Sequence, residues 1–300
     1  MTWAAMWGPA TALDERARPD PRDEVKVTPM SGISMTPIVQ LLRNLYHHQT
    51  LVFALAVREL QSRYVGTLGG ILWTFAHPLA VITVFYFVFA VGFKSQGPAG
   101  APFMLWFVCG LVPWFFFNET LLAATDSITR HTHLIKKTVF PSEILPVVNI
   151  TAGLVPHTIF LLIVAGLLVW FQIPLEAGRL LVVYFLLCTC VLLVGLGWLL
   201  SAIQVFYRDV SHALSIMLNL WFWTTPILWS PDMIPEGYRG LLFFNPMYYI
   251  IEGYRGLLIY NEIVWPSARH TAYFGGAVTV TFAAGAYVFS RLKSEFADVM

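Results

Sequence analysis

The sequence predicts an all-α polytopic membrane protein whose chain crosses the bilayer six times. Hydrophobic residues make up 57% of its 300 residues and charged residues only 12%, whereas a soluble domain carries about 25% charge. The mean hydropathy is +0.67. Apolar stretches of the roughly 20 residues that a helix needs to cross the hydrocarbon core recur along most of the chain. Since lipid offers no partner to backbone N–H and C=O groups, each stretch is expected to be a helix.

Six of these stretches are long enough to span. They cover residues 69–93, 102–125, 144–171, 180–205, 210–229 and 271–290, and together they form a six-span domain over residues 69–293. The third and fourth exceed the minimum length, so we expect them to tilt or to extend past the headgroups. An even number of spans places both ends of the chain on one side. Most of the 18 Lys and Arg residues then fall on that side, which predicts that both ends lie in the cytoplasm.

The segment before the first span divides into two parts. Residues 1–35 are rich in Pro, Arg, Asp and Glu, so we expect a disordered N-terminal extension. Residues 36–68 are expected to hold an amphipathic cytoplasmic helix that lies in the plane of the interface. Its apolar stripe consists of Leu51, Leu55, Val57, Leu60 and Tyr64. A helix that simply anchors the chain to the membrane is the alternative.

Between the fifth and sixth spans, residues 230–268 repeat seven letters. EGYRGLL occupies residues 236–242 and again residues 252–258. Prolines interrupt the segment too often for it to span, yet it is too apolar for a free loop. We predict two short re-entrant helices on the outer side, hinged at Asn245 and Pro246. In each copy Glu and Arg stand three residues apart and can pair along one helical face, and we expect the second copy to lie deeper.

Several kinds of function are excluded by what the sequence lacks. A formal net charge of +1 leaves no basic footprint for nucleic acid. The sequence holds no G-x-x-x-x-G-K-[ST] loop to cradle ATP phosphates, and no G-x-S-x-G or H-E-x-x-H motif. The three cysteines lie in apolar runs, and His131 and His133 have no further ligands nearby, so no metal site is expected. We therefore expect a chain without enzymatic activity or a cofactor of its own.

Five segments of the sequence, taken in their order along the chain, form a recognisable pattern. They are VRELQSRYVGTLGGILWTFAHPLA (57–80), CGLVPWFFFNETL (109–121), LIKKTVFPSEILPV (134–147), FYRDVSHAL (206–214) and IPEGYRGLLFFNPMYYIIEGYRGLL (234–258). In this order the segments resemble the permeases of polysaccharide ABC exporters. The resemblance covers residues 40–290, and it is nearer to the type-2 permeases that export O-antigen and teichoic-acid chains than to capsule exporters.

The resemblance implies a permease subunit that moves a lipid-linked polysaccharide from the cytoplasmic side across the bacterial inner membrane. It also implies a homodimer of six-span subunits with two copies of an ATPase subunit, which would hold ATP and Mg²⁺. A capsular polysaccharide exporter, or a small-lipid or drug exporter of the same fold, is the alternative within transport. A membrane-bound enzyme of envelope glycan assembly is the alternative from another class, and it would need catalytic residues that the sequence does not display.

Two sets of candidate site residues belong to the transport path. In the family, spans one and five line an aromatic channel, which implies that it is lined by Trp73, Phe85, Tyr86, Phe89, Trp221, Phe222 and Trp223. The two short outer helices are expected to close its exit at rest. The candidate outer-gate residues are Tyr238, Arg239, Tyr249, Glu252, Tyr254 and Arg255.

Two further sets belong to the cytoplasmic side. The basic loop of residues 126–142 is expected to dock the ATPase through Ile135, Lys136 and Lys137. An anionic lipid headgroup is expected to bind at Arg58, Arg63 and Tyr64, because guanidinium forks match the paired oxygens of a pyrophosphate. General attraction of these arginines to ordinary anionic phospholipid is the alternative.

Overall fold

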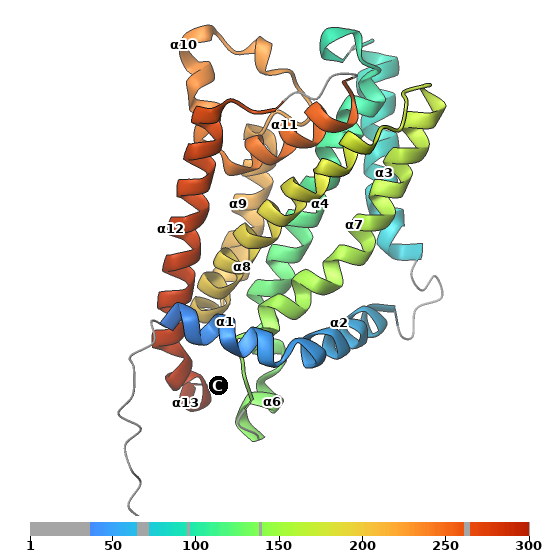
Figure 1. Cartoon of the computed structure of the whole chain (residues 1–300). Coiled ribbons are helices and arrows are strands. Elements are labelled where there is room, and N and C mark those ends of the chain that lie inside the picture. Colours follow the sequence, from blue (N-terminus) through green and yellow to red (C-terminus); the bar gives the residue numbers. More distant parts are fainter. Residues whose placement is uncertain (1–36, 65–71, 95–96, 138–139, 261–264, 300) are drawn as a thin grey trace, which may run out of the picture. The chain divides into compact units, whose positions relative to one another are not determined.

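The structure is a helical bundle with short helices at both of its ends (Figure 1). It is a computed structural model that describes residues 37–64, 72–94, 97–137, 140–260 and 265–299. Within these residues the regular structure is entirely helical. The all-α prediction is therefore confirmed for the described part of the chain. The predicted extension of residues 1–35 lies outside it.

Four helices are long and apolar enough to cross a membrane. They are α4 (Phe103–Thr125), α7 (Ile144–Trp170), α8 (Val182–Phe206) and α12 (Ala268–Leu292). These four helices coincide with the second, third, fourth and sixth predicted spans. The prediction of a polytopic membrane protein is confirmed, while the number of six spans stays a prediction.

The first and fifth predicted spans are shorter helices. The first is α3 (Leu72–Phe85), which continues as a π-helical segment over Tyr86–Gly92. The fifth is α9 (Val210–Thr224), which ends before the apolar run does. Thr225 has extended backbone angles, φ −90° and ψ 131°, as is usual for a residue that precedes a proline. The residues after Thr224 therefore turn away from the helix axis.

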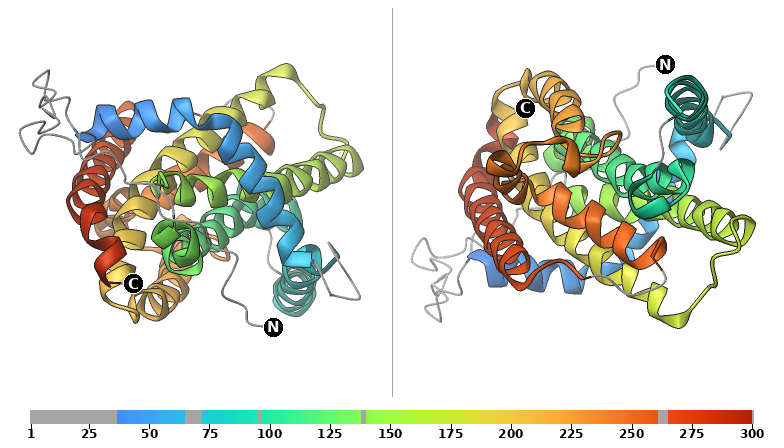
Figure 2. Two further views of the ribbon diagram at one scale, coloured as in Figure 1. Left: turned by 90° about the horizontal axis from the view of Figure 1, so that it is seen from below. Right: turned by 90° about the horizontal axis from the view of Figure 1, so that it is seen from above.

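The segment before the first span forms two helices where one was expected. They are α1 (Pro37–His47) and α2 (Gln49–Tyr64), with the break at His48. Seen from below, the two helices cross the same end of the bundle (Figure 2, left), where α1 packs on α12 and α2 packs on α7. On α2, Val52 and Ala56 are the buried positions, and Val57 of the predicted stripe is exposed. Leu51, Leu55 and Leu60 of the stripe are partly buried against the same cluster, so the face that α2 turns to α7 overlaps the predicted stripe but leaves out Val57.

Within the described chain, two short α-helices and two 3-10 segments lie between α9 and α12; that the α-helices re-enter the membrane from the outer side stays a prediction. The α-helices are α10 (Glu236–Arg239) and α11 (Pro246–Leu258). The side chain of Asn245 accepts a hydrogen bond from the backbone N–H of Met247 and so caps α11, with Pro246 in its first turn. The predicted hinge therefore coincides with a helix boundary. α11 packs against α4 and α8 inside the bundle.

The helices α8 and α12 approach closely because glycines face each other. A Cβ atom on Gly195 would lie 2.8 Å from the Cα atom of Phe282, and one on Gly285 would collide with the carbonyl oxygen of Gly195. Close approach through small residues is the usual way in which helices pack within a membrane, because lipid supplies no hydrophobic drive between them.

Replacing Gly285 with valine should separate these two helices. We expect the Gly285→Val variant to lose about 1–3 kcal/mol of stability in detergent, the usual range for overpacking, measured as a lower midpoint of thermal unfolding. The control is Gly276→Val on the same helix, where an added Cβ meets nothing within 4 Å. Equal behaviour of the two variants would show that the close approach does not stabilise the fold.

Candidate functional site

A deeply buried charge belongs to Arg255, in the second copy of the repeat. Its residue is only 1% exposed. The guanidinium donates from Nε to the carbonyl oxygen of Trp106 at 3.2 Å, from Nη1 to that of Pro226 at 2.7 Å, and from Nη2 to that of Ile227 at 2.9 Å. Nη1 also forms an ion pair with Oε1 of Glu252 at 3.0 Å. A buried charge is tolerable only when it is paired and hydrogen-bonded in this way.

An aromatic ring, a glycine and a helix end form the binding place of this guanidinium. It stacks on the Trp106 ring with its central carbon 3.6 Å from the ring centroid, a favourable cation–π arrangement. Gly110, one turn further along α4, leaves the space, since a Cβ there would lie 2.6 Å from Nη2 of Arg255. The early end of α9 leaves the carbonyl groups of Pro226 and Ile227 free of intrahelical hydrogen bonds. Arg255 therefore ties α4, the turn after α9 and α11 together.

The first copy of the repeat has a different environment. The side chain of Arg239 is 40% exposed and pairs with Asp232, Nη1 to Oδ1, at 3.8 Å. It also donates to the backbone carbonyls of Ile234 and Asp232. The expected pair with Glu236 was therefore wrong, whereas the Glu252 pair of the second copy and its deeper position are confirmed.

The remaining candidate gate residues divide in the same way. Tyr238 is exposed, Glu252 is half-buried, and Tyr249 and Tyr254 are fully buried. The hydroxyl of Tyr254 lies 3.0 Å from Nε2 of His157 on α7. Of the six candidate gate residues, Tyr238, Arg239 and Glu252 thus reach the surface of the described chain, whereas Tyr249, Tyr254 and Arg255 do not.

The aromatic candidates of α3 and α9 come together beside α4. The ring of Phe85 lies 6.4 Å from that of Phe222 and 6.5 Å from that of Trp223. Phe89 stacks on Phe103 of α4. Trp221 packs on α4 and donates from Nε1 to Oδ1 of Asn245 at 2.8 Å. Tyr86 and Trp223 are exposed, and the Trp73 side chain lies outside the described part.

At the opposite end, short helices carry the basic candidates. α5 (Ser127–Arg130) and α6 (Thr132–Lys137) follow α4. Ile135 packs into the cluster that contains Ile128 and Phe296, while Lys136 is exposed. The side chain of Lys137 lies outside the described part.

A cleft of about 280 Å³ lies between α2 and this loop. Its lining includes the side chains of Arg58, His131 and His133 over a floor of aliphatic residues. The side chains of Arg63 and Tyr64, at the end of α2, lie outside the described part. Among the described residues, no group of three or more His, Cys, Asp or Glu side chains is placed to hold a metal ion.

A second buried charge, Glu143, was missed by the sequence analysis. It lies just before α7 and is 0% exposed. Its Oε1 accepts from Nδ2 of Asn44 on α1, and its Oε2 accepts from Nζ of Lys293 after α12, both at 2.6 Å. Its backbone oxygen accepts from Nε1 of Trp198 on α8 at 3.0 Å. One residue thus joins four parts of the chain.

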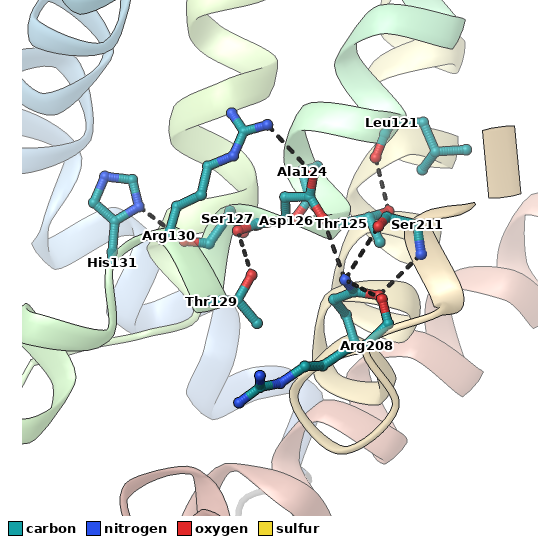
Figure 3. A network of polar contacts seen from close by, with 11 residues as sticks. Leu121, Ala124, Thr125, Asp126, Ser127, Thr129, Arg130, His131, Arg208 and Ser211 are labelled. Carbon is teal, nitrogen blue, oxygen red and sulfur yellow. Dashed lines mark hydrogen bonds and ion pairs between the residues drawn. The ribbon is translucent and has the colours of Figure 1, made fainter. Parts of the chain in front are cut away.

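A third polar connection holds the end of α4 (Figure 3). Gln204 of α8 donates from Nε2 to Oδ1 of Asp126 at 3.4 Å and to Oγ of Ser211 at 3.2 Å. Oε1 of Gln204 accepts from the backbone N–H of Ser211 at 2.9 Å. Arg130 pairs with the other oxygen of Asp126 at 3.3 Å. The loop after α4 and the loop after α8 are therefore linked.

Removing the Arg255 side chain should destabilise the folded protein. We expect Arg255→Ala to cost roughly 3 kcal/mol, since three buried carbonyl groups lose their donor and each unsatisfied group costs about 1–3 kcal/mol. Arg239→Ala, the equivalent change in the first copy, should cost less than about 1 kcal/mol because its partners are solvated. Thermal unfolding of both variants in detergent measures the difference. An Arg255→Ala protein as stable as Arg239→Ala would contradict the structural role.

Comparison with known proteins identifies similar sequences over most of the chain. The profile of the ABC-2 type transporter family matches residues 50–259. An O-antigen export system permease protein, RfbA, from Klebsiella pneumoniae is 28% identical over 272 residues, which are 87% of this chain and 99% of the relative. RfbA of Myxococcus xanthus is 29% identical, again over 87% of this chain and 99% of its own. The polysialic acid transport protein KpsM of Escherichia coli is 23% identical over 67% of this chain and 78% of its own.

Proposed function

The chain belongs to the ABC-2 type transporter family, and from this membership we propose that it is the permease subunit of an exporter for a lipid-linked polysaccharide. It is a multi-pass protein of the bacterial inner membrane, with apolar helices of spanning length. Two relatives named as O-antigen export permeases match over nearly their whole length, which supports a cargo of O-antigen type. The shorter match to a polysialic acid transport protein makes a capsular polysaccharide the second candidate.

Energy for transport would come from a separate ATPase. The sequence has no phosphate-cradling loop, so ATP and Mg²⁺ would bind to two ATPase subunits beneath a homodimer of this chain. The docking surface would be the end of the bundle that carries α2, α5 and α6, facing the cytoplasm (Figure 1). Lys136 is exposed there, and the anchoring of Ile135 in the core allows α6 to move as part of the bundle.

The transport path would run between the two copies. In the described chain, exposed aromatic and aliphatic residues gather on α3, on the π-helical segment that follows it and on α9, among them Tyr86, Phe87 and Trp223. Sugars present apolar C–H faces that stack on such rings without a deep binding well, so a long chain can slide along them. The short helices α3 and α9 would then count as the first and fifth spans, and α10 and α11 would close the outer exit.

Cargo would be received at the cleft beside α2. Arg58 and His133 are exposed at this cleft, and His131 is half-buried there. A guanidinium binds phosphate oxygens in pairs, which supports recognition of a pyrophosphate-linked lipid. Arg63 and Tyr64 belong to the same proposed set.

Reconstitution with the partner tests the function directly. We expect the pure chain to hydrolyse no ATP, and its complex with the ATPase in proteoliposomes to hydrolyse ATP faster when a lipid-linked O-antigen is present. A complex stimulated equally by a short-chain lipid or a drug would contradict the polysaccharide assignment. Hydrolysis by the chain alone, free of partner, would contradict the permease assignment.

Charge reversal in α6 tests the docking surface. Lys136→Glu combined with Lys137→Glu should lower glycan-stimulated hydrolysis and co-purification of the ATPase by about tenfold, because both lysines belong to α6 and their charges would be reversed. The control is Lys94→Glu, an exposed lysine between α3 and α4, which should leave both measurements unchanged. Wild-type coupling in the double variant would assign docking to another surface.

A further inference from the structure

A cavity at the start of α12 belongs to none of the sets described above. Its volume is about 190 Å³, and it opens between the first turns of α12 and the single-turn segment Gly240–Phe244. The lining consists of Gly240, Phe243, Phe244, Ser267, Arg269, His270 and Tyr273. No carboxylate is among these residues.

Three features make this cavity attractive to an anion. The first is the N-terminus of a 25-residue helix, where unpaired N–H groups and the helix dipole favour negative charge. The second is Arg269, which is exposed and forms no ion pair with the residues that the structure describes. The third is His270, only 5% exposed, whose Nε2 atom has no hydrogen-bond partner in the described part of the chain.

The orphaned imidazole nitrogen is the most informative of the three. Buried polar atoms are almost always hydrogen-bonded, to protein or to a bound molecule. The ring of His270 is held in place by Phe243 at 4.8 Å and Tyr249 at 5.0 Å between centroids. Its backbone N–H donates to the Ser267 hydroxyl that caps α12. This rigidly held nitrogen and the Arg269 guanidinium line the same cavity, and neither has a side-chain partner among the described residues. Together they point to a ligand that supplies the missing partner.

The surroundings of the cavity are those of a membrane surface. Phe244 and Tyr273 pack edge to face at 5.2 Å, and both are exposed, as is Leu241. Aromatic side chains gather at the level of lipid headgroups. Acyl chains would therefore lie beside the opening, with the polar lining at headgroup depth.

We propose that this cavity binds the phosphate of a phosphate-ester headgroup. Phosphate oxygens accept from the Arg269 fork and from the first N–H groups of α12, while the His270 ring contributes a further donor. The aromatic walls contact the glycerol and ester groups. The phosphate can come from a bilayer phospholipid or from a soluble phosphate ester. The site is built by this chain alone, so it does not depend on the export role.

Native mass spectrometry with dioleoyl phosphatidylglycerol tests the site. We expect the full-length wild-type protein in detergent to retain one such lipid per chain, and Arg269→Gln to weaken its binding about tenfold. Arg269→Lys keeps the charge without the fork and should fall between the two. His270→Phe keeps an aromatic side chain but removes both imidazole nitrogens, and should also weaken binding. Thermal unfolding of each variant checks that the fold is intact.

A matched control separates a site from general surface attraction. Lys94→Gln removes one positive charge from another exposed position and should leave lipid binding unchanged. An equal loss in Lys94→Gln, or wild-type binding in Arg269→Gln, would overturn the proposal.

Two further probes identify the source of the phosphate. Preference for phosphatidylglycerol over phosphatidylcholine marks the bilayer lipid as the ligand, because the choline cation opposes Arg269. Arg269-dependent binding of glycerol phosphate, without that preference, marks a soluble ester. Absence of Arg269-dependent binding of either probe rejects the site. Since neither probe requires ATP hydrolysis, a failure of the export role would leave these results unaffected.

Discussion

A guanidinium buried in an apolar bundle must have its donors satisfied, and the architecture around α11 follows from that requirement. Arg255 draws on the carbonyl groups of Trp106, Pro226 and Ile227. Those of Pro226 and Ile227 are available because α9 stops at Thr224. The guanidinium itself fits because position 110 is glycine. The end of α9, Gly110 and the Trp106 ring therefore together form the binding place of one guanidinium. These tertiary contacts, rather than intrinsic helical propensity, hold the short helix α11 in the bundle.

Glu143 is likewise a buried charge whose partners are supplied by other segments, at the end of the bundle that carries α1. Its carboxylate is fully buried; Asn44 of α1 donates a hydrogen bond to it, and Lys293 after α12 neutralises its charge. The long helices, by contrast, pack through small residues, as Gly195 and Gly285 show. The protein therefore uses two kinds of contact. Glycine surfaces bring long helices together, and buried charges attach the short helices α1 and α11 to the bundle.

Much of this fold could be predicted from the sequence, because apolar length and helix-stop signals are local. Four spans and the boundary at Asn245 and Pro246 were predicted on that basis. The end of the fifth span was predicted too late, because apolar residues continue past Thr224 into a turn that Pro226 imposes. The break between α1 and α2 at His48 could not be predicted, because no glycine or proline marks it in the sequence.

The candidate site was less predictable, because its partners are distant in sequence. Two identical copies of EGYRGLL have the same local pattern, yet only the second meets Trp106, 149 residues away. The first meets Asp232, which precedes the repeat. Glu143 resembles an ordinary charge at a helix start, and its partners Asn44 and Lys293 lie 99 and 150 residues away. Local spacing cannot indicate contacts of that range.

These contacts also suggest how the two ends of the proposed exporter communicate. α4 is one helix of 23 residues, about 34 Å long at 1.5 Å per residue. The Asp126 network that links both loops lies at its end, and Trp106 and Gly110, which hold Arg255, lie near its start. A displacement of the loop at α5 and α6 would therefore reach α11 through a single packed element. Pro113 is the one proline within that helix and removes a backbone hydrogen bond, so any bending of α4 between the two ends would concentrate there.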